Sequence, residues 1–264
     1  MPIRLPILLR FIFLPTMRYL IHLTLILLLL SALAGCGPKQ ELDPTADWSA
    51  ERFYNEARSE LNDGNYLTAI EYYETLESRY PFGQYAMQAQ IDVAYAYFKF
   101  NEPDSAITAI DRFIKLHPRH PSVDYAYYLK GLVNFERGGT ILDVISERDL
   151  SEFDRNLLLR AFNDFKLLIQ RFPSSKYATD ARKRMVHLRN ELARADYNVA
   201  NFYASREAWI AVTGRTQFIL ANYQGTTVIR PTLELQLRAY RELGLDRLAE
   251  DTQRIIDLNY GDRS

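Results

Sequence analysis

The sequence has little of what covalent frameworks, active sites and nucleic-acid surfaces require. Its 264 residues include one cysteine, Cys36, and four histidines, and the net charge is −1. A lone cysteine forms no intramolecular disulfide, so stability must come from burial of a core. Residues 1–35 carry three arginines and no acid, so the rest of the chain is slightly acidic. This slightly negative net charge argues against the large basic surface that nucleic-acid binding needs.

Catalytic and metal-binding motifs are also missing from the sequence. It contains no HExxH, no G-x-S-x-G and no glycine-rich phosphate loop. His117 and His120 form an H-x-x-H pair, but prolines place them in a turn without acids, and zinc needs more ligands. We therefore expect no enzyme, no metal and no cofactor apart from covalent lipid. An enzyme that uses these histidines or the acidic residues of 137–154 is the alternative.

One long hydrophobic run is present, at residues 19–35, directly after Arg18. A basic start, an apolar stretch and small residues before a cut are typical of a secretory signal. The run is short for a bilayer span, which takes about 20 residues. We expect a signal peptide over residues 1–35, with Met17 as the better start because prolines interrupt residues 1–16.

The residues at 33–36 read LAGC and resemble a bacterial lipobox. This resemblance implies cleavage before Cys36 and acylation of its sulfur and amino group, and acyl chains anchor at roughly 0.8 kcal/mol per buried CH₂. A buried packing cysteine is the alternative. Gly37 replaces the Asp that usually retains such proteins in the inner membrane, which implies the periplasmic face of the outer membrane. Residues 36–47 are polar and contain proline, so they are expected to form a lipidated tether.

From Trp48 onward the sequence is predicted to be all-α and repetitive. Alanines, leucines and tyrosines recur at helical spacing between short turns, without sustained strand alternation. Residues 53–81 align with residues 90–118 at an offset of 37, which places Ala57 on Ala94. Small residues let two helices cross closely, and a proline ends the second helix. This spacing matches the tetratricopeptide pattern of about 34 residues.

Three less regular units follow these two. The third has Gly131 and Ala161 at its small positions, with residues 137–154 inserted between its helices. The fourth has Ala200 and a first helix that extends back to about Tyr177, and the fifth begins near residue 230. We expect a helical-hairpin solenoid of about five repeats over residues 48–260. Its N-terminal half would span 48–136 and its C-terminal half 155–260.

The first helix of each hairpin is expected to line the concave face of the solenoid. Its inward positions are rich in tyrosine with a few cations, which suits an extended peptide. Arg58 and Lys99 are candidates for binding a carboxylate, and ordinary surface cations are the alternative. The predicted groove residues are Tyr54, Arg58, Asn62, Tyr95, Phe98, Lys99, Tyr125 and Tyr128, with Ile91, Leu132 and Phe135 also counted as inward-facing.

Three stretches carry a resemblance to one family. They are RYPFGQYAMQAQIDVAYAYFK at 79–99, DRFIKLHPRHPSVDYAYYLKGL at 111–132 and FPSSKYATDARKRM at 172–185. Together with the lipobox they resemble the BamD (ComL) family of lipoproteins in the outer-membrane β-barrel assembly machine, over roughly residues 48–258. The stretch ILDVISERDLSEFD within the insertion departs from that family's usual pattern.

The resemblance implies a non-catalytic scaffold. Its N-terminal repeats would bind C-terminal targeting strands of unfolded barrel proteins, which end in an aromatic residue and a carboxylate. Its C-terminal repeats would dock the barrel-forming insertase, with Arg215 as part of that contact, and another lipoprotein of the machine would lie along the scaffold. The alternative function is an adaptor lipoprotein for cell-envelope or peptidoglycan enzymes.

Overall fold

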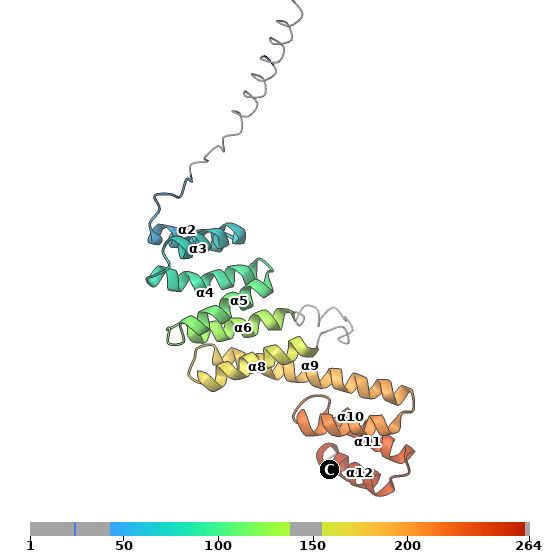
Figure 1. Cartoon of the computed structure of the whole chain (residues 1–264). Helices are drawn as coiled ribbons and strands as arrows, with labels where there is room; N and C mark the ends of the chain where they lie inside the picture. Colours follow the sequence, from blue (N-terminus) through green and yellow to red (C-terminus); the bar gives the residue numbers. More distant parts are fainter. Residues whose placement is uncertain (1–23, 25–42, 138–154, 262–264) are drawn as a thin grey trace, which may run out of the picture. The chain divides into compact units, whose positions relative to one another are not determined.

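The computed structural model describes residue 24 and residues 43–137 and 155–261 of the chain (Figure 1). The chain divides into two units, residues 1–48 and residues 49–264. In the first unit, residues 44–47 form a turn, and Asp43 caps it by accepting a 2.7 Å hydrogen bond from the Thr45 hydroxyl. No helix of the described residues is long and apolar enough to cross a membrane. The predicted signal peptide, Cys36 and nearly all of the insertion lie outside the described residues.

The described part of the second unit contains ten helices, which pair into five hairpins, and no strand. The pairs are α2 (Ala50–Asp63) with α3 (Tyr66–Arg79), α4 (Gln84–Lys99) with α5 (Pro103–Leu116), α6 (Val123–Arg137) with α8 (Arg155–Arg171), α9 (Ala178–Ser205) with α10 (Trp209–Asn222), and α11 (Ile229–Glu242) with α12 (Asp246–Tyr260). Each helix packs on the next one along the chain. First helices also pack on one another, α2 on α4, α4 on α6 and α9 on α11. The predicted all-α solenoid of hairpins is confirmed.

The turn inside four of the hairpins repeats one backbone geometry. Gly64 ends α2 with a positive φ of 83°, and the next amide, that of Asn65, donates to the Glu60 carbonyl at 2.9 Å. This bond belongs to the Schellman motif, which favours glycine. Asn101, Glu207 and Gly244 hold the matching positions of later hairpins, with φ of 64°, 57° and 68°. Asn101 and Gly244 each lie 37 residues beyond the matching residue of the preceding hairpin, so the sequence offset is also a structural repeat.

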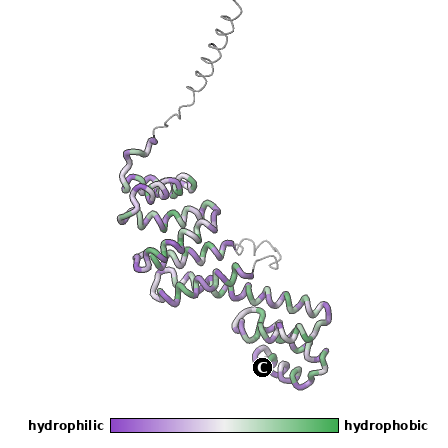
Figure 2. Tube along the Cα trace, viewed as in Figure 1, coloured by the Kyte–Doolittle hydropathy of each residue, from purple (hydrophilic) through white to green (hydrophobic). Residues whose placement is uncertain are grey.

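Small residues lie where the helices of a hairpin cross, as the spacing predicted. Ala57 and Ala69 are fully buried in the first hairpin, and Ala94 and Ala106 in the second. In the third hairpin the corresponding position is Gly131, which packs against the ring of Phe165. Every helix carries both hydrophobic and hydrophilic residues along its length (Figure 2). The apolar side chains therefore face neighbouring helices and form a core that continues from hairpin to hairpin.

Two of the expected inward-facing residues belong to this core instead. Ile91 is fully buried and packs in a cluster with Ile110, Phe113 and Leu129. Phe135 is only 4 % exposed and belongs to the large cluster that extends from α6 to α11. The expectation that these two residues line a groove was wrong, because they face the second helix of a hairpin.

Candidate protein-binding site

The surface formed by α2, α4, α6 and the start of α9, called here the first-helix face, carries most of the predicted groove residues. Tyr54 on α2 donates its hydroxyl to the Oδ2 atom of Asp92 on α4 at 2.9 Å. Gln88, one turn before Asp92, donates to its Oδ1 atom at 2.9 Å. Burial raises the pKa of Asp92, while these two bonds and the charge of Arg58 oppose the rise. A carboxylate therefore joins the first two hairpins at the predicted groove.

Arg58 and Lys99, the predicted carboxylate ligands, are both exposed on this face. Among the described residues neither makes a hydrogen bond or an ion pair, although Arg58 lies close enough to act on Asp92 electrostatically. The 37-residue offset puts Lys99 level with Asn62, one turn beyond Arg58 along the helices. Asn62 is exposed as well. The two cations thus keep their hydrogen-bond donors available to a ligand.

Tyrosines continue the first-helix face from α4 towards α9. The rings of Tyr95 and Phe98 lie 6.3 Å apart. Burial raises the pKa of Tyr125, and the nearby Tyr95 and Asp92 raise it further. The ring of Tyr125 also lies 5.4 Å from that of Tyr177, at the start of α9. Two successive hairpins thus contribute four predicted aromatic residues to one surface, namely Tyr95, Phe98, Tyr125 and Tyr128.

Tyr128 closes this surface at α9 through contacts that the sequence did not reveal. Its ring stacks on Tyr177 with 4.8 Å between the centroids and 15° between the planes. Its hydroxyl donates to Asp180 at 2.6 Å, and Arg184 donates to the same carboxylate at 2.6 Å. Burial opposes ionisation of Asp180, but these bonds and the Arg184 charge outweigh it and lower the pKa of Asp180.

Asp92 is the functional candidate that sequence reasoning missed on α4. Counting from the small residues selected Ile91 and Tyr95, which lie on either side of it. The spacing of Gln88, Asp92, Tyr95 and Lys99 is four, three and four residues, which defines one helix face. That stripe was the available signal for Asp92.

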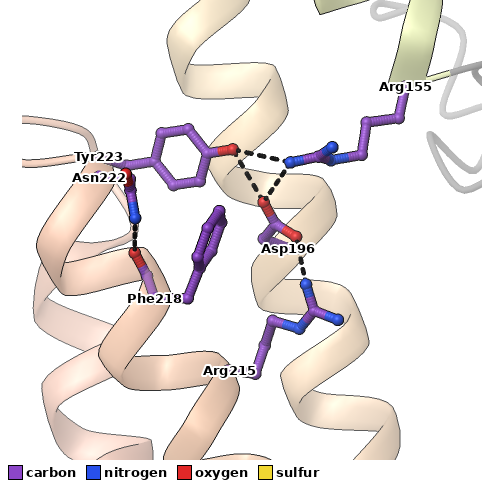
Figure 3. A network of polar contacts seen from close by, with 6 residues as sticks. All are labelled: Arg155, Asp196, Arg215, Phe218, Asn222 and Tyr223. Atoms are coloured by element: carbon purple, nitrogen blue, oxygen red, sulfur yellow. Dashed lines mark hydrogen bonds and ion pairs between the residues drawn. The ribbon is translucent and has the colours of Figure 1, made fainter.

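Arg215, the predicted docking residue, takes part in a polar network between three helices (Figure 3). Its Nη1 atom lies 2.9 Å from Oδ1 of Asp196, whose side chain is 3 % exposed. Tyr223 donates its hydroxyl to Oδ2 of Asp196 at 2.9 Å, and Arg155 approaches the same oxygen at 3.4 Å. Asp196 lies on α9, so the network joins α8, α9 and α10. Arg215 remains about one third exposed, at 34 %.

The two turn histidines each have a polar contact within the protein. A ring nitrogen of His117 lies 2.8 Å from Oε1 of Gln90, and the Ser122 amide donates to Nδ1 of His120 at 3.1 Å. Burial and the neighbouring His117 lower the pKa of His120. Within the described ranges, no group of three or more His, Cys, Asp or Glu side chains could hold a metal ion.

Residues 46–255, which include both the first-helix face and the Asp196 network, match the model of the YfiO family, described as an outer membrane lipoprotein. This chain belongs to the YfiO family. Its membership confirms the predicted outer-membrane location and the lipoprotein class. Acylation of Cys36 itself stays a prediction, because that residue lies outside the described part of the chain.

Relatives of this YfiO-family chain bear the name outer membrane protein assembly factor BamD. The protein of Neisseria meningitidis serogroup B is 44 % identical over 233 residues, which are 87 % of each chain. That of Vibrio cholerae serotype O1 is 41 % identical over 88 % of this chain and 96 % of its own. The resemblance to the BamD family, and with it the class of outer-membrane protein assembly lipoprotein, is confirmed.

Among solved structures, this chain is similar to the TPR2AB domain of yeast Sti1 in its complex with pHSP90. The match covers 80 % of this chain and 77 % of the Sti1 chain. The TM-score is 0.45 at 11 % sequence identity, a likeness that carries no weight for function. The groove residues, the docking role of Arg215 and the division of this YfiO-family chain into halves remain predictions.

Proposed function

We propose that this chain is a non-catalytic scaffold in outer-membrane protein assembly. Its N-terminal hairpins hold the C-terminal strand of an unfolded barrel protein, and its C-terminal hairpins dock the barrel-forming insertase. Other lipoproteins of the machine bind along it, and the lipid on Cys36 holds it at the membrane. The family and the shared name of its relatives support the assembly role.

One observation carries the peptide-binding part of this proposal. Arg58 and Lys99 are exposed, unpaired cations on the first-helix face. Arg58 acts electrostatically on Tyr54, and Lys99 follows Tyr95 by about one helical turn. A terminal carboxylate accepts charge-assisted hydrogen bonds from such groups, and tyrosine rings bind an aromatic side chain at low entropic cost. A strand that ends in an aromatic residue and a carboxylate fits both features.

The polar groups of this face are suited to binding rather than catalysis. Burial and the hydrogen bond to Asp92 raise the pKa of Tyr54 to about 12, so it remains a hydrogen-bond donor at neutral pH. His117 contacts Gln90 on α4 and His120 accepts from the Ser122 amide within its turn, so neither ring is paired with a nucleophile through these bonds. A catalytic base, by contrast, must lie within hydrogen-bond reach of the proton that it removes and have a pKa near the working pH.

The C-terminal hairpins offer a different surface to the insertase. Arg215 is fixed by Asp196 on one side and about one third exposed on the other. An arginine held in this way loses less side-chain entropy when it binds a carboxylate of a partner. This arrangement supports Arg215 as part of the docking contact.

Peptide binding tests the proposal directly. We expect a synthetic barrel-protein C-terminal peptide to bind the full-length protein in detergent, and its C-terminally amidated form to bind about tenfold more weakly, as for loss of one charged hydrogen-bond pair. Arg58→Ala combined with Lys99→Ala should remove that difference. The control is Lys166→Ala combined with Arg182→Ala, two exposed cations on α8 and α9. Equal affinities for both peptides would contradict the carboxylate role.

A capture experiment tests the assembly role separately. The tagged protein, crosslinked in its native envelope, should recover the barrel-forming insertase. Recovery of murein hydrolases without the insertase would favour the adaptor alternative.

A further inference from the structure

The carboxylate of Asp92 is an anion that lacks a counter-ion in contact. Its two hydrogen-bond donors, Tyr54 and Gln88, are both uncharged. A carboxylate has about four lone-pair positions for acceptance, so two are left open after these bonds. The side chain is neither fully buried nor fully exposed, which leaves it within reach of a ligand.

Arg58 does not fill the place of a counter-ion. It lies near enough to favour ionisation of Asp92, but no ion pair or hydrogen bond joins the two side chains. Its guanidinium is exposed instead. The first-helix face therefore has a separate positive group and a separate negative group in the same region.

Tyrosines gather beside this carboxylate. The ring of Tyr54 lies 6.1 Å from that of Tyr73 and 5.5 Å from that of Tyr85. Tyr73 is fully buried, and its hydroxyl has no hydrogen-bond partner within the described residues. An unsatisfied buried hydroxyl of this kind is unusual in a folded protein. Burial raises the pKa of Tyr73, and the charge of Asp92 raises it further.

A carboxylate with open acceptor positions beside tyrosine rings has the chemistry of a cation site. Ammonium and guanidinium groups are attracted to aromatic faces and form short, strong hydrogen bonds with carboxylates. A neutral ligand would leave the partly buried charge uncompensated, which is unfavourable in a medium of low dielectric constant. The site therefore discriminates in favour of a cation.

We infer that Asp92, with Tyr54 and Tyr85, forms a specificity site for a lysine or arginine side chain of the bound substrate strand. The inference rests on the proposed function, because it takes the substrate strand as the occupant. Arg58 binds the terminal carboxylate of the strand, and Asp92 binds a cation that lies some residues before it. Two opposite charges at different places on one face fix both the direction and the register of the strand.

A double-mutant cycle between protein and peptide tests this site. The probes are short synthetic peptides that end in a phenylalanine carboxylate and carry one lysine at successive upstream positions, each matched by a norleucine peptide. With the full-length protein in detergent, lysine at one position should give about fivefold to tenfold tighter binding than norleucine, as expected for a partly desolvated pair. Asp92→Asn should abolish that ratio.

The cycle cancels general effects of the substitution on folding, since only the lysine-to-norleucine ratio is compared. A wild-type measurement adds independent support, because the ratio should fall as salt concentration rises. A ratio near one at every position in the wild-type protein would overturn the inference, as would a ratio that persists in Asp92→Asn.

Amidated versions of the peptides separate this inference from the proposed function. If amidation has no effect but the lysine preference depends on Asp92, the carboxylate role of Arg58 fails and the cation site stands. If amidation weakens binding but lysine brings no gain, the cation site fails and the carboxylate role stands. Absence of binding by every peptide would overturn both.

Discussion

The ring of Phe165 on α8 lies directly against the Cα atom of Gly131 on α6. A Cβ atom built on Gly131 would lie 2.5 Å from Cε1 of that ring, well inside van der Waals contact. Phe165 is itself fully buried, so the ring has little room to move. Glycine at position 131 is thus required by packing between the helices of the third hairpin.

Gly131→Ala is expected to destabilise the protein despite the better helix propensity of alanine. Overpacking a core costs typically about 1–3 kcal/mol, whereas alanine gains about 0.5–1 kcal/mol over glycine inside a helix. The free energy of unfolding in urea should therefore fall by about 1–2 kcal/mol, and Phe165→Leu in the same chain should restore part of the loss.

Gly214→Ala provides the matched control for that measurement. Gly214 also lies inside a helix, α10, but a Cβ atom there would meet nothing within 4 Å. Alanine should raise the free energy of unfolding by about 0.5–1 kcal/mol at this position. Equal effects at positions 131 and 214 would contradict the packing explanation.

Glu207→Gly is expected to stabilise the fourth hairpin. Glu207 has a positive φ of 57° at the turn position that Gly64 and Gly244 hold in the first and last hairpins. The left-handed conformation costs a residue with a Cβ atom roughly 1–2 kcal/mol, part of which glycine loses again through its flexible unfolded state. A net gain of about 0.5–1 kcal/mol should appear in thermal or urea unfolding.

Asn101→Gly tests the same reasoning with a smaller expected effect. Asn101 has a φ of 64°, but asparagine tolerates this region better than glutamate does. A stabilisation larger than that of Glu207→Gly would show that backbone conformation is not the cause.

The fold could be predicted from the sequence because its repeat is set by helix-crossing geometry. Ala57, Ala94 and Gly131 recur where two helices approach, and such positions tolerate only small side chains. A single offset therefore located hairpins, turns and crossings together. Ile91 and Phe135 were misassigned because a hydrophobic residue one position round the helix faces the partner helix rather than the open face.

The polar contacts of the site could not be predicted in the same way. The Tyr54–Asp92 bond joins residues 38 apart, and the Arg215–Asp196 pair joins residues 19 apart. Each pair depends on side-chain rotamers and on the rotation of one helix against another, which spacing does not determine. The tyrosines were found because their helix face is regular, but their acidic partners were not.

Arg215→Ala is expected to weaken both the fold and insertase binding, and the two effects can be separated. Asp196 keeps Tyr223 and the longer contact to Arg155 when Arg215 is removed. Loss of one charged hydrogen bond should lower the free energy of unfolding by about 1.5–3 kcal/mol. Arg155→Ala, which removes two longer contacts of 3.4 Å, to Asp196 and to the Tyr223 hydroxyl, should cost less.

Insertase capture by these two variants then decides whether Arg215 docks the partner. At a temperature where both variants are fully folded, Arg215→Ala should recover less insertase than Arg155→Ala. Equal recovery would limit Arg215 to its internal role with Asp196.

Cys36→Ser is expected to remove the protein from the outer membrane. The serine cannot form the thioether on which the lipid anchor depends. The apolar segment at residues 19–35 is short for a bilayer span, so it does not replace the lipid as an outer-membrane anchor. Fractionation should move the variant out of the outer-membrane fraction, and its signal should remain uncleaved. A variant that stays membrane-bound, with its signal cleaved as before, would contradict acylation at this residue.

Asp92→Asn is expected to stabilise the protein at neutral pH, which a purely structural role of the carboxylate would not allow. Burial raises the pKa of Asp92 above its unfolded value. A group with a raised pKa contributes its full stability below the unfolded pKa of about 3.9 and loses it as the pH rises through the folded pKa. At pH 7 the ionised side chain is therefore less favourable in the folded protein than in water.

The unfolding free energies of wild type and Asp92→Asn should thus differ most at pH 7, with the variant more stable. The difference should shrink as the pH falls towards the unfolded pKa, because the wild-type carboxyl then becomes neutral as well. Urea titrations of both proteins at several pH values measure it. A lower stability of Asp92→Asn at pH 7 would mean that the bonds from Tyr54 and Gln88 outweigh burial, and that Asp92 serves the fold rather than a ligand.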